Sequence, residues 1–273
     1  MSETAICTDS SALLPTDRAE RLGIRIVPLS VLLDGEAFDE RSGDVDGFYA
    51  RLEQGGEAKT SQPSPGDFAD AYADAARRGS KRVLSIHLDA RVSGTSRSAE
   101  LAAREAEIPV SVVDTTTVSY GVGVCVRAAA RALEAGASAE EAAHDAANLG
   151  TRMQNAFVAR TGADGRVPGR ADWAVLTFEN GAAIPLAVCD SAEAAIEAMT
   201  ARVQHEDQAV EAAVGHAGAV VATSADSLAN ALARSTHVVG VERYRVGASV
   251  GAHTGPVSFG TFWWPTAHRV VDG

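Results

Sequence analysis

Cysteine is scarce in this sequence. Its 273 residues include three cysteines, Cys7, Cys125 and Cys189, which lie far apart and form no C-x-x-C pair. An odd number of widely spaced cysteines in apolar surroundings argues against a disulfide framework and against a zinc site. We therefore expect all three to be thiols in a folded core.

Long apolar runs and basic clusters are also missing. No stretch approaches the roughly 18 apolar residues of a membrane-spanning helix, and no basic segment followed by an apolar run stands at the N-terminus. We therefore expect a cytoplasmic protein without stable membrane insertion. The formal net charge is −12, and no cluster of lysine and arginine offsets it, so nucleic acid is disfavoured as a partner.

Several motifs of catalysis and cofactor binding do not occur. The chain has no G-x-S-x-G nucleophile elbow, no G-x-G-x-x-G, no phosphate-binding loop with its lysine, and no side chains at metal-ligand spacing. We therefore expect no metal, no cofactor and no catalytic residues. With 46% apolar residues, the chain can still bury the core of one large domain or of two modest ones.

The most informative stretch is Ser93-Gly94-Thr95. Residues 83–88 are typical of a short buried strand, and residues 96–107 carry apolar side chains at helical spacing. The turn between them is therefore expected at a helix N-terminus, where free N–H groups and the helix dipole favour an anion. Gly94 would let a ligand approach the main chain, and the two hydroxyls would add donors. The alternative is that these hydroxyls only cap the helix.

A second loop that carries hydroxyls precedes a predicted helix over residues 65–78. Ser64 suits the N-cap of this helix. Gln62 and Ser64 each precede a proline, which pushes both residues towards extended conformation. Thr60 and Ser61 are thus expected on an extended loop, where capping does not account for them.

Strands alternate with helices in the first half of the chain. This order favours a mostly parallel sheet with helices on both faces, in a three-layer α/β/α domain. Ligands of such sheets bind beyond the carboxyl ends of the strands, so Asp9 and Asp114, which follow two strands, are expected at the same rim as the hydroxyl loops. The predicted strands are 4–7, 24–33, 83–88 and 109–113, with a hairpin at Asp34-Gly35, and the predicted helices are 15–23, 45–54, 65–78, 96–107, 118–134 and 138–152.

The second half follows a different order and predicts a second α/β domain with a mixed or antiparallel sheet. Asn180-Gly181 between two apolar runs is a strong hairpin signal. We place the boundary after residue 152, which gives domains 1–152 and 153–273, with the segment 55–80 packing with either. The predicted strands are 156–159, 173–178, 183–188, 218–222 and 238–246, the predicted helices are 192–205 and 225–235, and residues 210–214 are expected to form a further turn or two.

Five short motifs are spread in order along nearly the whole chain. They are Thr8-Asp9-Ser10-Ser11, Val27-Pro28-Leu29, Thr60-Ser61-Gln62-Pro63-Ser64, Ser93-Gly94-Thr95 with Ser98-Ala99, and His253-Thr254-Gly255-Pro256. Together they resemble the DegV family of fatty-acid-binding proteins. The resemblance implies a two-domain α/β protein that buries one long-chain fatty acid, with the carboxylate between the domains and the tail inside the C-terminal domain. It also implies a partner, a dihydroxyacetone-kinase-like fatty acid kinase that makes the acyl phosphate, so that the binding protein itself is not the enzyme.

The resemblance assigns the ligand's carboxylate to particular side chains. Matched position by position, Thr60 and Ser93 are the principal hydrogen-bond donors, with the Gly94 N–H and His253 nearby. The full ligand-binding set that the resemblance implies is Thr60, Ser61, Ser93, Gly94, Thr95 and His253.

The chain departs from the family's pattern at four places. Leu88-Asp89 stands where a serine pair is usual, and Ser96-Arg97 stands where Tyr-Gln is usual. Val257 replaces the glycine after the final Gly-Pro, and residues 161–167 replace a longer leucine-rich segment. These changes bear on tail selectivity and on kinase docking, and the sequence specifies neither the acyl chain nor the oligomeric state.

A serine hydrolase acting on a lipid or a small ester is the alternative function. It would use Ser93 as nucleophile, His253 as base and Asp9 or Asp114 as the orienting acid. A nucleotide-binding site at the same turn is less favoured, because the motifs for binding phosphate are missing. His87, on a predicted strand, is expected to be structural.

Overall fold

The computed structural model describes residues 3–159 and 173–266. The chain divides into two compact units. The first comprises residues 1–151, 178–182 and 246–253, and the second comprises residues 152–177, 183–245 and 254–273. The units therefore interleave along the sequence, where the sequence analysis drew a single boundary. Residues 161–167, where the sequence departs from the family's pattern, lie outside the described residues.

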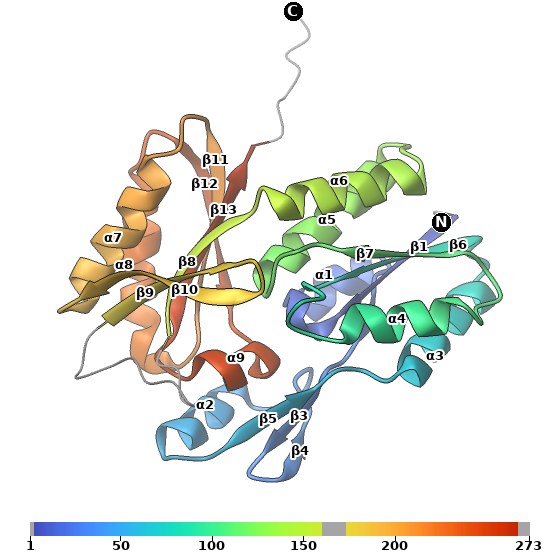
Figure 1. The fold of residues 1–273 in the computed structure, drawn as a ribbon, viewed down its shortest axis with the longest axis horizontal. Coiled ribbons are helices and arrows are strands. Elements are labelled where there is room, and N and C mark those ends of the chain that lie inside the picture. Colours follow the sequence, from blue (N-terminus) through green and yellow to red (C-terminus); the bar gives the residue numbers. More distant parts are fainter. Residues whose placement is uncertain (1–2, 160–172, 267–273) are drawn as a thin grey trace, which may run out of the picture. The chain divides into compact units, whose positions relative to one another are not determined.

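The first unit contains a four-stranded sheet in the order β2-β1-β6-β7, with all neighbouring strands parallel. Helices α3 and α4 lie on one side of this sheet, and α5 and α6 lie on the other (Figure 1). The predicted three-layer arrangement with a parallel sheet is therefore confirmed. The elements are β1 Thr4–Asp9, η1 Ser10–Ala12, α1 Thr16–Arg21, β2 Arg25–Val27, α3 Pro65–Arg77, β6 Arg82–His87, α4 Thr95–Ala103, β7 Val110–Asp114, α5 Tyr120–Glu134 and α6 Ala139–Thr151.

Local sequence signals explain where α3 begins and which face it buries. The Ser64 hydroxyl accepts a hydrogen bond from the Asp67 N–H at 3.2 Å, and the Asp67 carboxylate accepts one from the Ser64 N–H at 2.7 Å. This reciprocal pair satisfies two N–H groups of the chain at the helix start. Phe68 and Tyr72 then recur four residues apart and are buried against the sheet. The expectation that Ser64 is the N-cap is confirmed.

A small antiparallel sheet in the first unit has the order β4-β3-β5. Asp34 and Gly35 connect β3 to β4 with positive φ angles of 51° and 87°, as a tight hairpin turn requires. The predicted strand over 24–33 is not continuous. It breaks at Pro28, which has no N–H to donate to a ladder, so β2 joins the parallel sheet and β3 joins the small one. The elements are β3 Ser30–Leu33, β4 Glu36–Phe38, α2 Val45–Glu53 and β5 Ala58–Ser61.

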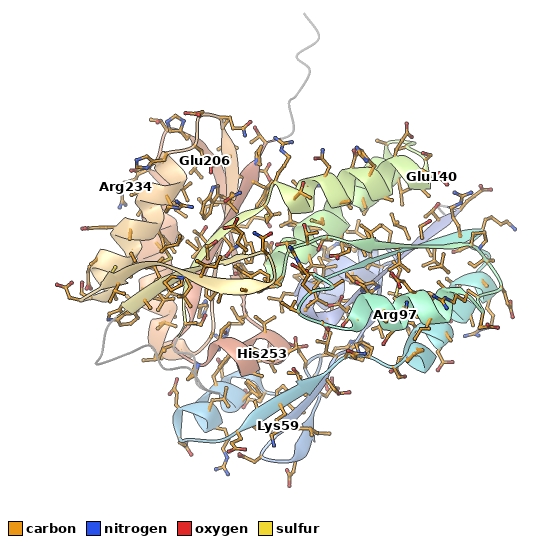
Figure 2. All side chains as sticks on the ribbon, viewed as in Figure 1. Lys59, Arg97, Glu140, Glu206, Arg234 and His253 are labelled. Atoms are coloured by element: carbon orange, nitrogen blue, oxygen red, sulfur yellow. The ribbon has the colours of Figure 1, made fainter. Side chains whose placement is uncertain are left out.

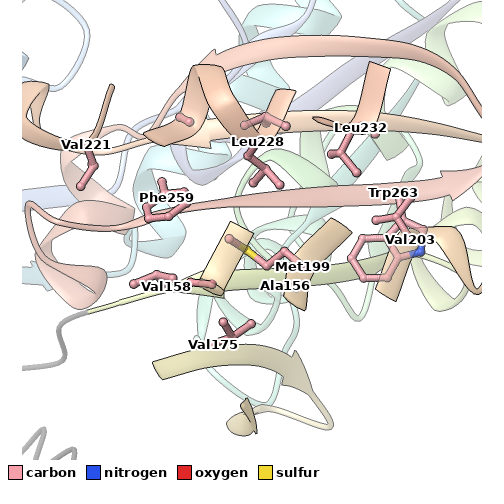
Figure 3. Close-up of a cluster of buried hydrophobic side chains, with 14 of the residues drawn as sticks. Ala156, Val158, Val175, Met199, Val203, Val221, Leu228, Leu232, Phe259 and Trp263 are labelled. Carbon is pink, nitrogen blue, oxygen red and sulfur yellow. The ribbon is translucent and has the colours of Figure 1, made fainter. Parts of the chain in front are cut away.

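The second unit is built on a six-stranded mixed sheet in the order β10-β9-β8-β13-β11-β12. Strands β11 and β12 are parallel, while β13 runs antiparallel to both β8 and β11. Helices α7 and α8 pack on the sheet, and Met199, Leu228 and Trp263 lie in the shared core (Figure 3). The elements are β8 Gln154–Val158, β9 Trp173–Glu179, β10 Ala182–Cys189, α7 Ala192–Gln204, β11 Val210–His216, η2 Ala219–Val221, α8 Ala222–Ala233, β12 Val238–Arg245 and β13 Phe259–Pro265.

Two predicted elements of the second half are wrong, and one helix was missed. Residues 210–214, expected as a turn, belong to β11, which pairs on both sides. Residues 218–222, expected as a strand, form the short helix η2 and the start of α8. The missed helix is α9, Ala248–Thr254, whose residues up to His253 belong to the first unit.

The structure also bears on the expectation of core thiols and on that of no membrane-spanning helix. Cys7 and Cys125 are buried, Cys189 is half-buried, and all three are free thiols. Burial raises the pKa of Cys7 and of Cys125 to about 12, so both stay protonated at neutral pH. In the part of the chain that the structure describes, no helix has the length and the apolar character to cross a membrane.

Candidate functional site

Thr60 on β5 and His253 on α9 meet through their side chains. The Thr60 Oγ1 and the His253 Nε2 lie 2.8 Å apart. His253 keeps much of its surface exposed, yet partial burial of its ring lowers its pKa below the ordinary value. The lowered pKa favours the neutral imidazole at pH 7. Figure 2 labels His253 on α9 and Lys59, the neighbour of Thr60, on β5.

The Ser93 hydroxyl is held by Thr95 at the start of α4. The Ser93 and Thr95 hydroxyl oxygens are 2.8 Å apart, and the Thr95 N–H donates to the Ser93 Oγ at 3.3 Å. A serine hydroxyl has one proton and two lone pairs. When Thr95 donates its hydroxyl proton as well, both lone pairs of Ser93 are occupied. The Ser93 proton is then left for a further acceptor.

Gly94 is the N-cap residue of α4. It has no side chain to cap the first-turn N–H groups, of which the Thr95 N–H donates to the Ser93 Oγ. The positive end of the helix dipole lies at this N-terminus, where the first-turn N–H groups point out of the helix. The turn therefore has the donors that an anion needs, as its sequence predicts.

Gln62 joins the two predicted loops. Its Nε2 donates to the Ser98 Oγ at 3.3 Å, and its amide lies against Gly94, where an added Cβ would be 2.6 Å from Nε2. Thr60 and Ser61, expected on an extended loop, instead end strand β5, which pairs with β3. Gln62 follows this strand and contacts the turn that carries Ser93. No role was predicted for Gln62. Its signal in the sequence is its position between Ser61 and a proline in the third of the five motifs.

Replacing Gly94 with alanine should displace the Gln62 side chain. The φ of −74° is ordinary for alanine, so the expected cost comes from the contact and not from the backbone. Losing the hydrogen bond to Ser98 should lower the free energy of unfolding by about 0.5–1.5 kcal/mol, measured by urea denaturation. The control is Gly66→Ala in α3, where an added Cβ would make only an ordinary contact, 3.4 Å from the Ser64 Oγ. Equal stability changes in the two variants would show that Gln62 is not held at Gly94.

The triad that the alternative function, a serine hydrolase, would need is not assembled among these residues. The His253 Nε2 faces Thr60, and Asp9 pairs with a different histidine. The Asp9 carboxylate accepts from His87 Nδ1 at 2.8 Å, and it also accepts from the Ser11 N–H at 3.1 Å and from the Ser11 hydroxyl. Asp9 is therefore occupied and does not orient His253.

His87 itself belongs to a buried chain of hydrogen bonds. Its Nε2 lies 2.7 Å from the Ser85 Oγ, which in turn lies 2.9 Å from the Tyr72 hydroxyl. Asp9, His87 and Ser85 each have 0% of their surface exposed. The hydrogen bonds of this Asp-His-Ser arrangement and of Tyr72 join β1, β6 and α3. The expectation that His87 is structural is confirmed by these contacts.

Asp114 and Asp89 shape the loops at the same rim. Asp114 accepts hydrogen bonds from the N–H groups of Thr116 at 2.8 Å and of Ala90 at 3.2 Å. Asp89, one of the departures from the family's pattern, is buried and paired with Arg91 at 2.6 Å. Burial opposes its charge, but the hydrogen bonds from Arg91 outweigh that effect and lower the pKa of Asp89. Both carboxylates thus have structural partners. Within residues 3–159 and 173–266, no group of three His, Cys, Asp or Glu side chains is placed to hold a metal ion.

Comparisons with known proteins agree on one family. A family model described as an uncharacterised protein of the DegV family matches residues 3–165. A DegV domain-containing protein of Streptomyces coelicolor is 36% identical over 272 residues, which is 92% of this chain and 95% of that protein.

Solved structures resemble the whole chain. A DegV family protein from Thermus thermophilus, described as binding fatty acid, has a TM-score of 0.87 and 28% identity, with 97% of this chain and 100% of that chain covered. A Thermotoga maritima protein, described as revealing a fatty acid binding function, has a TM-score of 0.86 and 28% identity, with the same coverage.

Proposed function

This chain belongs to the DegV family, and from that premise we propose that it binds one long-chain fatty acid by its carboxylate. The proposed binding set is Thr60, Ser61, Ser93, Gly94, Thr95 and His253. The observation that carries the proposal is that full-length structural relatives at 28% identity are described as binding fatty acids. All six residues belong to the first unit of the chain.

The hydrogen-bond chemistry of the site supports a carboxylate as the group it receives. A carboxylate only accepts hydrogen bonds, so its partners must donate. Ser93 has a proton to give when Thr95 occupies its lone pairs. Thr60 can give its proton when the neutral His253 donates its Nε2 hydrogen to the Thr60 oxygen. We therefore propose that ligand binding favours the tautomer of His253 with hydrogen on Nε2.

The energetics support the same ligand class. Charge-assisted hydrogen bonds contribute about 1.5–3 kcal/mol each, so three or four of them offset a desolvation cost of several kcal/mol for the carboxylate. At about 0.8 kcal/mol for each buried CH₂, a 16-carbon tail gives roughly 12 kcal/mol before the costs of association. The burial of the tail in the C-terminal domain, which the family resemblance implies, remains a prediction.

The purified protein should carry or take up a fatty acid at one-to-one stoichiometry. Native mass spectrometry followed by denaturing extraction measures this directly. A ligand present at 100 times its dissociation constant should add about 2.7 kcal/mol to the free energy of unfolding, so saturating acid should raise the melting temperature. Saturated and monounsaturated acids of 14 to 18 carbons are the ligands to test. The proposal is wrong if none of them binds or raises the melting temperature.

We further propose that the protein is a carrier and not the enzyme. In this proposal it presents the bound acid to a separate dihydroxyacetone-kinase-like fatty acid kinase, which forms the acyl phosphate. The family resemblance and the occupied partners of Asp9 and Asp114 support this division of labour. Because such a kinase uses ATP, we place the meeting of the two proteins in the cytoplasm.

A further inference from the structure

The segment that carries His253 packs in the first unit, although the residues before and after it in the sequence belong to the second unit. Residues 246–253 belong to the first unit, whereas residues 183–245 and those from 254 onward belong to the second. Figure 1 shows α9 beside α2 and the small sheet. The position of His253 relative to Thr60 therefore depends on what holds α9 against these elements.

Tyr49 of α2 makes the first of these contacts. Its hydroxyl donates to the Val246 carbonyl at 2.9 Å and lies 3.3 Å from the Gly247 carbonyl. The ring is 1% exposed and passes so close to Gly251 that an added Cβ there would be 2.7 Å from ring carbons. The absence of a side chain at Gly251 is thus what lets α9 approach α2.

Glu40, in the loop between β4 and α2, makes the second contact. Its Oε1 accepts from the Ser249 N–H at 2.7 Å and from the Ser249 hydroxyl at 2.8 Å. An added Cβ at Gly247 would be 3.2 Å from the Glu40 carboxyl carbon, with the Oε1 closer still. Burial raises the pKa of Glu40, and the hydrogen bonds from Ser249 counteract that rise. Burying a carboxyl group without hydrogen-bond partners costs free energy, so the hydrogen bonds from Ser249 stabilise the contact between this loop and α9.

We propose that Tyr49 and Glu40 are positioning residues for the ligand's carboxylate, because they set the place of His253 against Thr60. Both residues come from the module that also carries Thr60, namely the small sheet with α2. Their hydrogen bonds hold the residues just before α9 and its first turn, and His253 near the end of the helix then meets Thr60. Neither side chain needs to touch the ligand. The inference rests on the proposed function, since the carboxylate is what His253 and Thr60 would serve.

The test is the variant Tyr49→Phe, which removes one hydroxyl and keeps the ring, with Glu40→Ala as the second variant. Each should weaken binding of a fatty acid about three- to tenfold while changing the affinity for the fatty alcohol of the same length little. In a His253→Ala background, adding Tyr49→Phe should have no further effect on acid binding, because the two residues act through one contact. Nitrogen NMR of the imidazole in the ligand-free protein should show an altered tautomer balance or pKa of His253 in both variants.

The matched control is Tyr72→Phe in α3, which also loses a buried hydroxyl but hydrogen-bonds to Ser85, away from α9. It should lower stability without changing the ratio of acid to alcohol affinity. The proposal is overturned if Tyr49→Phe and Glu40→Ala behave like this control, or if their effects persist in full without His253. If the wild-type protein binds no fatty acid, the proposed function fails, whereas the NMR signals of His253 still decide the positioning role.

Discussion

Replacing Ser93 or Thr60 with alanine should weaken the binding of a long-chain fatty acid about ten- to a hundredfold and leave the protein folded. Each hydroxyl can donate to the ligand, Ser93 when Thr95 donates to its oxygen and Thr60 when His253 donates to its oxygen. Losing one donor to a buried carboxylate costs about 1.5–3 kcal/mol, which gives this range of affinity. Isothermal titration of wild type and both variants with palmitate measures the effect.

Two controls separate the site from general damage. The methyl ester or the alcohol of the same chain lacks the charge, so its affinity should change much less in both variants. Ser111→Ala removes an exposed serine hydroxyl from β7 and should leave acid binding as in wild type. If both variants of Ser93 and Thr60 bind the acid as tightly as wild type, the carboxylate is held elsewhere in the protein.

Replacing Asp9 with alanine should produce the largest loss of stability among the changes considered. The substitution leaves His87 Nδ1 and the N–H and hydroxyl of Ser11 without their acceptor, and these groups are buried. We expect a loss of about 3–5 kcal/mol in the free energy of unfolding. This corresponds to a drop of roughly 6–20 °C in the midpoint of thermal unfolding of the first unit. Urea denaturation and calorimetry give the two values.

The matched control for this change is Asp17→Ala in α1. Asp17 also pairs with a basic side chain, that of Arg21, but both side chains are more than 60% exposed. Water and salt screen such a pair, so its loss should lower the free energy of unfolding far less than the loss of Asp9 does. Similar losses in the two variants would contradict the structural role assigned to the buried chain from Asp9 to Tyr72.

Turns and helix starts were predicted well, because a few neighbouring residues determine them. Asp34-Gly35 and Asn180-Gly181 both adopt the positive φ angles that their hairpins need. The hydrogen bonds of Ser64 with Asp67 and of Ser138 with Glu141 formed as their spacing predicts. In each case the interacting groups lie within four residues of one another, so the sequence itself brings them together.

The wrong predictions lie where partners distant in sequence decide the structure. Strand β11 is rich in alanine and shows no alternation, since it is flanked by β12 and β13 and is mostly buried. The apolar run of η2 has the composition of a strand, but it has no place in the sheet and leads directly into α8. Helix α9 is short and contains Gly251, and contacts with Tyr49 and Glu40 hold it.

In the candidate site too, local features were predicted from the sequence and contacts between distant residues were not. The sequence indicated the turn at Ser93 from a strand followed by a helix, and the motif indicated the loop at Thr60. Nothing in the residues alone showed that Gln62 would lie on Gly94 or that Asp9 would pair with His87, 78 positions away. Such pairs depend on which strands become neighbours in the sheet, and that is a property of the whole fold.

The interleaving of the two units has a consequence for the order of folding during synthesis. The first unit has most of its residues once position 151 has left the ribosome, but it receives residues 246–253 about a hundred residues later. At about 5–20 residues per second, this delay is roughly 5–20 s. Throughout that interval Tyr49 and Glu40 lack their partners on α9, and Thr60 lacks His253. We therefore expect the nascent chain to form its parallel sheet early and to complete the candidate site for the carboxylate only after residue 253 has been made.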